Sequence, residues 1–126
     1  MSQKVSFVAG EAISRGEGVA IQADDTADLA SGTAAPATFV AFADYAVGEV
    51  GAFYAPGSEQ VYGIAQGAIA AGARIVNSES ADGAFATIGT VAAGASIEVV
   101  GIAQTDAVDG GPLWFSFAPV LHTVPV

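Results

Sequence analysis

The chain has 126 residues, of which 52% are hydrophobic, and its 13 carboxylates outnumber its three cations to give a formal net charge of −10. This length fits one domain, and the hydrophobic content is far above that of disordered chains. Binding to nucleic acid or to an anionic membrane surface requires clustered lysine and arginine, so we expect neither partner. The sequence contains no cysteine, which excludes disulfides, thiolate metal sites and cysteine nucleophiles.

Neither an export signal nor a membrane span is predicted. The N-terminal segment reaches Glu11 and Arg15 too soon to contain the apolar core of a signal peptide. No window of the sequence reaches the roughly 18 uncharged, strongly apolar residues that a spanning helix requires.

The sixteen glycines are scattered between short runs rich in Val, Ile, Phe and Tyr, a pattern typical of many short strands joined by turns. We predict an all-β, sandwich-like or barrel-like fold, in a single domain spanning residues 1–126 with extended terminal arms. About nine short strands are expected, at 4–9, 18–23, 38–47, 50–55, 60–66, 73–77, 84–88, 96–104 and 112–118.

Two connections are predicted from their turn residues. Asp82-Gly83 precedes an alternating apolar segment, so residues 75–88 read as a hairpin with a short polar loop. Residues 24–36 lack bulky apolar side chains except Leu29, and this segment is expected to be an exposed loop or a very short strand.

The stretch "GIAQGAIAAGARIV" at 63–76 returns in part at 101–114, where "GIAQ" recurs. Its apolar spacing permits a helix, but three glycines in a helix interior would each destabilise it by roughly 1 kcal/mol. Both copies are consistent with a strand that ends in a glycine corner, after which a new strand begins. Similar corners occur around Gly16 and Gly94, and the predicted structural turn glycines are Gly16, Gly72, Gly83, Gly94 and Gly110.

No catalytic, metal-binding or cofactor-binding residue is predicted, and we expect no enzymatic activity. The glycine-rich stretch lacks the Lys and Ser/Thr of a phosphate loop. His122, the single histidine, lies in the tail, where nothing would hold it as a general base. The acidic set Asp24, Asp25 and Asp28 lacks the order of a calcium loop, and Asp106 and Asp109 are expected to support a turn.

The aromatic residues and the two ends of the chain are candidate contact sites. Leu113, Phe115 and Phe117 share one strand face and are expected in the core. Trp114 lies on the opposite face of that strand, where it is either exposed at a partner interface or buried. The same two alternatives, partner interface or burial, apply to Phe53 and Tyr54. Residues 1–9 (a candidate arm or strand) and 119–126 (a candidate arm) are too apolar for solvated tails, and dock either on a neighbour or on their own domain. The candidate interface residues are Phe7, Trp114, Leu121, His122 and Val124.

The segments "AISRGEGVAI", "GAIAAGARIVNSESADGAFATI" and "GASIEVVGIAQTDAVDGGPLWFSF" resemble the small capsid cement, or head decoration, proteins of tailed bacteriophages. In that family an apolar-x-x-Gly-x-x-apolar corner opens a strand, and a late "GIA" strand leads through an Ala/Gly/Asp turn to the last strand. The residues that match this plan are Gly72, Ile75, Asp82, Gly83, Gly101, Ile102, Ala103 and Gly110. The chain departs from the plan at its aromatic segment 38–60 and in its longer C-terminal tail.

The resemblance implies a structural virion protein, assembled in the host cytoplasm, that binds the outside of an icosahedral head and clamps adjacent subunits of the major capsid protein. It also implies a homotrimer, and no cofactor. The alternative is a carbohydrate-binding or adhesive β-module that uses Trp114, Tyr54 or Tyr62 as a stacking platform, and a carboxylate enzyme based on Asp106 and Asp109 is the remaining rival.

Overall fold

The computed structural model describes residues 4–31, 37–78, 80–88 and 96–123, and the side chains within them except those of 96–98 and 121–123. This part of the chain forms ten strands and no α-helix, so the prediction of an all-β domain is confirmed, and no helix in it could span a membrane. The strands are β1 (Lys4–Ala9), β2 (Gly18–Ile21), β3 (Thr26–Leu29), β4 (Phe39–Ala41), β5 (Val50–Tyr54), β6 (Val61–Ile64), β7 (Arg74–Asn77), β8 (Phe85–Thr87), β9 (Ser96–Ala103) and β10 (Pro112–Thr123).

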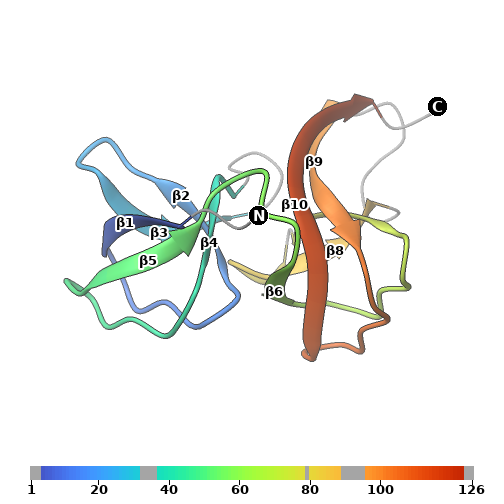
Figure 1. The fold of residues 1–126 in the computed structure, drawn as a ribbon, viewed down its shortest axis with the longest axis horizontal. Helices are drawn as coiled ribbons and strands as arrows, with labels where there is room; N and C mark the ends of the chain where they lie inside the picture. Colours follow the sequence, from blue (N-terminus) through green and yellow to red (C-terminus); the bar gives the residue numbers. More distant parts are fainter. Residues whose placement is uncertain (1–3, 32–36, 79, 89–95, 124–126) are drawn as a thin grey trace.

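The strands form two sheets that lie side by side (Figure 1). Strands β1 to β5 close into a barrel in the order β1-β3-β2-β4-β5, and β6 to β10 form a sheet in the order β6-β10-β9-β7-β8. The ends of the second sheet also meet, because Ala65 and Phe85 form a parallel bridge and the Gln66 N–H donates to the Phe85 carbonyl at 2.7 Å. We call β1 to β5 the first β unit and β6 to β10 the second β unit.

The two β units repeat one strand plan. In the first unit Val19 pairs with Phe39, and in the second unit Ile75 pairs with Gly101 at the corresponding place. The antiparallel pairing of β1 with β5 returns as β6 with β10, and the hairpin of β2 with β3 returns as β7 with β8. The chain is therefore an internal duplication at the level of structure.

Each β unit contains two corners that cross and bond to each other. Ile13 and Tyr45 exchange both backbone hydrogen bonds in the first unit, at 2.9 and 2.8 Å. Ile69 and Ala107 exchange the same two bonds in the second unit, at 2.9 and 2.8 Å. The repeated "GIAQ" stretches are the strands that lead into the crossed corners of the second unit.

The segment 24–36, predicted as an exposed loop or a very short strand, contains the short strand β3. Its Ala27 is buried in the first unit, and β3 pairs with β2 through residues 27–29. Hydrogen bonding to both neighbours explains a strand in a segment that has few bulky apolar residues, because closure of the barrel satisfies its backbone groups. Strand β4 is shorter than the predicted segment 38–47, since the chain turns into a corner at Phe42.

Both candidate arms lie in the chain's own sheets as far as they are described. Residues 4–9 form β1, which pairs with β5 along most of its length. Residues 119–123 continue β10 against β9 after a register shift between Phe117 and Val120, where Pro119 interrupts the regular ladder. Residues 1–3 and 124–126 are outside the described part of the chain.

The two β units share buried surface and so form one domain. One core cluster fills the first barrel and includes Val19, Ala41 and Phe53. The other fills the second unit but also takes in Val40 and neighbouring alanines of the first. The backbone joins the units as well, since the Gly18 N–H donates to the Gly83 carbonyl at 2.8 Å.

Candidate functional site

The carboxylates stabilise turns and corners. Asp106 accepts the Ala71 N–H at 2.8 Å and Asp109 accepts the Gly67 N–H at 2.7 Å, so each bonds across the crossed corners. Asp44 accepts the Arg15 N–H at 2.7 Å in the first unit. Within the described ranges no group of three His, Cys, Asp or Glu side chains could hold a metal ion.

Among the described residues, two carboxyl groups have shifted pKa values, and neither lines the groove described below. Burial raises the pKa of Glu17, whose carboxylate accepts the Ser14 N–H at 2.6 Å at the first corner. A hydrogen bond from the Thr26 hydroxyl, at 2.7 Å, lowers the pKa of the exposed Asp24. These shifts follow from local structure and do not pair an acid with a base.

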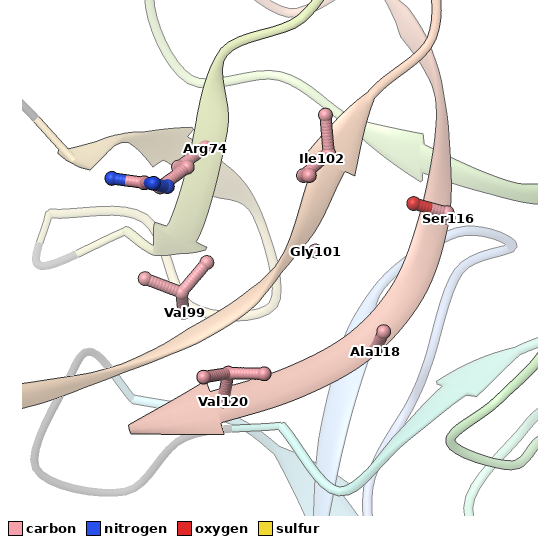
Figure 2. Close-up of a pocket in the computed structure, with 7 residues that line it drawn as sticks. All are labelled: Arg74, Val99, Gly101, Ile102, Ser116, Ala118 and Val120. Atoms are coloured by element: carbon pink, nitrogen blue, oxygen red, sulfur yellow. The ribbon is translucent and has the colours of Figure 1, made fainter. Parts of the chain in front are cut away.

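The described surface is hollowed on the outer face of the second sheet, where seven residues from β7, β9 and β10 line a groove of about 240 Å³ (Figure 2). Arg74, Ile102 and Ser116 are register partners on three adjacent strands, and we call them the outer row. Val99 and Val120 pair across β9 and β10 and form the other side.

Small side chains make the floor of this groove. Gly101 and Ala118 lie between the outer row and the valine pair along β9 and β10 (Figure 2). A Cβ at Gly101 would lie within van der Waals exclusion of the Ser116 carbonyl oxygen, so the close approach of β9 and β10 requires glycine there. The lining is apolar except for Arg74 and Ser116.

The three cations of the chain differ in their surroundings. The Lys4 ammonium lies 4.6 Å from the Phe42 ring centroid, and the Arg15 guanidinium lies 4.1 Å from the ring centroid of Tyr62. Arg74 is exposed, and it has no ion-pair or aromatic partner within the described ranges. A guanidinium at the edge of an apolar groove can bind a carboxylate.

Four aromatic residues that are not fully buried form two pairs, and a cation lies over a ring of each pair. Trp114 is partly buried and packs edge-on against Tyr62 at 5.5 Å, and Arg15 covers that tyrosine ring. Phe42 and Tyr54 form an equivalent edge-on pair at 5.5 Å, and Lys4 lies over both rings. Phe53, by contrast, is fully buried in the first barrel.

The predicted interface residues that the structure describes lie in different parts of the fold. Phe7 is partly buried against Phe39, at 4.8 Å between ring centroids, and so belongs to the first core. Leu121 and His122 pair with β9 through their backbones, and their side chains are outside the described part. Val124 is also outside it.

Four of the five predicted turn glycines are in the described part, and all four have a positive φ: Gly16 (86°), Gly72 (87°), Gly83 (80°) and Gly110 (75°). Gly94 and the corner predicted around it fall in residues 89–95, which the structure does not describe.

Sequence reasoning missed the groove. Alternation along β10 correctly assigns Leu113, Phe115 and Phe117 to the interior, where each is fully buried. The same alternation along β9 places Ile102 on the outer face, and a bulky aliphatic residue at an outward position was the signal that the sequence offered for an apolar contact site. In the structure Ile102 is 48% exposed.

No protein-family model matches the sequence, and no curated protein matches it. A solved structure does share its fold. The chain is similar to the N base of head fiber gp8.5 of bacteriophage phi29, with a TM-score of 0.66, 18% sequence identity, and coverage of 94% of this chain and 95% of that chain. The likeness therefore extends over both β units.

Proposed function

We propose that this chain is a structural protein of a bacteriophage virion and that it associates with the head. The observation that carries the proposal is the fold likeness to the phi29 head fiber base, which covers 94% of this chain. The sequence resemblance to head decoration proteins points in the same direction, through the corner and turn residues of this fold.

In its more detailed form, the proposal places the protein on the outside of the head as a decoration or cement protein. It contacts the major capsid protein, clamps adjacent subunits as a homotrimer, and assembles on heads in the host cytoplasm. A protein that binds only the mature lattice stabilises that lattice by linkage, without catalysis or cofactor. Two β units that share buried surface and present an exposed apolar groove suit this role.

Co-sedimentation with purified heads tests the proposal. The protein is mixed with undecorated expanded shells and with unexpanded precursor shells, and its mass in solution is measured in parallel. Binding to expanded shells together with a trimeric mass is the expected result. Absence of binding to both kinds of shell would contradict a role on the head.

The alternative of a carbohydrate-binding module has less structural support. Stacking on a sugar requires an open aromatic face, but Arg15 covers a face of Tyr62 and Lys4 lies 5.5 Å from the ring centroid of Tyr54. Retention of the monomer on a glycan array, with loss of binding in Trp114→Ala, would favour this alternative over the head protein.

A further inference from the structure

The outer row has a structural equivalent in the first β unit. Gly18 pairs with Val40, and Val40 pairs with Tyr54, as Arg74 pairs with Ile102 and Ile102 with Ser116. We call Gly18, Val40 and Tyr54 the junction row. Both rows cross the same three strands of the repeated plan and face away from the interior of their own unit.

The junction row is an interface within the molecule. Val40 is fully buried and belongs to the core cluster of the second unit, and Tyr54 packs against that cluster. A Cβ at Gly18 would lie 3.0 Å from the Phe85 ring, so the second unit lies directly on this row. The duplicated fold thus uses this face of the first unit for docking.

The equivalent face of the second unit is open in the described structure. Ile102, which corresponds to the buried Val40, is 48% exposed, and Val120 on the other side of the groove is 60% exposed. The row borders the 240 Å³ groove and includes Arg74, which has no ion-pair or ring partner among the described residues. Exposed apolar side chains around a hollow provide a surface on which a partner's apolar side chain can be buried.

We propose that this groove docks an extended apolar segment of the head shell protein that carries one carboxylate. An apolar side chain of that segment fills the space between Ile102 and the valine pair, and its carboxylate pairs with the Arg74 guanidinium. This proposal rests on the proposed function, since it identifies the surface through which the chain contacts the head.

Charge decides the chemistry of the occupant. The chain carries a net charge of −10, so an acidic partner is repelled by most of its surface. Among the described residues that line the groove, the charged one is Arg74. A guanidinium–carboxylate pair that loses its water on binding gives a fixed register for an otherwise apolar contact. A groove of about 240 Å³ is below the size of small-molecule pockets and fits one or two side chains.

The test compares shell binding of three variants with that of the wild-type protein. Ile102→Asp places a charge in the groove, and Arg74→Glu reverses the one that is present. Val108→Asp is the matched control, because Val108 is 71% exposed in the same β unit and does not line the groove. Thermal unfolding of each variant verifies that the domain still folds.

We expect wild-type protein and Val108→Asp to bind expanded shells equally, and Ile102→Asp and Arg74→Glu to bind at least about tenfold more weakly. Wild-type binding together with unchanged binding of both groove variants would overturn the groove but leave the proposed function standing. No shell binding by the wild type would overturn both. If Ile102→Asp binds shells normally but loses self-association, the occupant is a second copy of this chain and the proposal is wrong.

Discussion

The guanidinium of Arg15 lies 4.1 Å from the ring centroid of Tyr62, so a side chain from the first β unit rests on the second. The residue after it, Gly16, approaches the same ring, and a Cβ at Gly16 would lie 2.6 Å from Cδ1 of Tyr62. This corner therefore joins the two units as well as turning the chain.

Gly16→Ala is expected to destabilise the protein more than Gly72→Ala, its equivalent in the second unit. Both glycines have nearly the same positive φ, 86° and 87°, so both substitutions incur a backbone penalty of about 1 kcal/mol. Only Gly16 has a ring against it, while Gly72 has open space within 4 Å. Overpacking adds about 1–3 kcal/mol at Gly16.

Urea unfolding of both variants measures this difference, with Gly72→Ala as the control for backbone strain. Equal losses of free energy of unfolding in the two variants would show that the contact between the β units contributes nothing at Gly16.

The strands were largely predictable because their side chains alternate and their turns carry glycine. β1 was predicted at its observed bounds, and the predicted hairpin at 75–88 is present as β7 and β8. For β3 the sequence left two alternatives open, an exposed loop or a very short strand, since its sequence, Thr-Ala-Asp-Leu, has little β-branched or aromatic character. Pairing with two neighbours in a closed barrel, which no local pattern contains, decides its conformation.

Asp106→Ala is expected to lower the free energy of unfolding by about 1 kcal/mol, because the Ala71 N–H loses its acceptor. Asp106→Asn retains an oxygen at the same position and should lose less. Asp44→Ala should behave like Asp106→Ala, since Asp44 accepts the Arg15 N–H at the equivalent corner. Chemical denaturation provides the measurement, and a larger loss in Asp106→Asn than in Asp106→Ala would contradict the hydrogen-bond explanation.

Glu17 and Asp24 are expected to affect pH-dependent stability with opposite signs. Burial raises the pKa of Glu17 in the folded chain. As pH rises, the Glu17 carboxyl group therefore loses its proton at a lower pH in the unfolded chain than in the folded chain. The contribution of Glu17 to the free energy of unfolding therefore falls between the ordinary pKa of a glutamate and its higher pKa in the folded chain. Glu17→Gln should gain stability relative to wild type across that window as pH rises.

The Thr26 hydrogen bond lowers the pKa of Asp24, so its contribution is present above the ordinary pKa of an aspartate. It is lost as pH falls through the lowered pKa of the folded chain. Asp24→Asn should therefore lose stability relative to wild type at neutral pH and match it in strong acid. Thermal melts of both variants over an acidic pH series check the signs, and parallel curves for the two variants would refute them.

The internal duplication was only partly visible in the sequence. Alignment of the two "GIAQ" stretches found the crossed corners within the second unit, and the corner at Gly16 was recognised as similar. Its crossing partner, around Gly48, was missed because the apolar pattern is altered there. Tyr45 stands where the second unit has Ala107, and Gly51 stands where it has Leu113.

The first unit has a large residue at 45 and a small one at 51, whereas the second unit has a small residue at 107 and a large one at 113. A Cβ at Gly51 would lie 2.5 Å from the Tyr45 ring, so the tyrosine fills the space that a larger residue at position 51 would take. The Tyr45 hydroxyl also accepts the Ala52 N–H at 2.9 Å and donates to the Ala52 carbonyl at 2.8 Å. Small residues at one position and large ones at the other therefore conserve packing while hiding the repeat.

A double-mutant cycle tests this exchange. Tyr45→Ala should lower the free energy of unfolding by about 3 kcal/mol, because it leaves a cavity and removes the hydroxyl from Ala52. Gly51→Leu should also destabilise, through its clash with the ring. The double variant Tyr45→Ala/Gly51→Leu restores the arrangement of Ala107 and Leu113, so it should be more stable than the sum of the single losses predicts, by at least about 1 kcal/mol. Additive losses would mean that the two positions do not share one space, and the packing explanation for the hidden repeat would then be wrong.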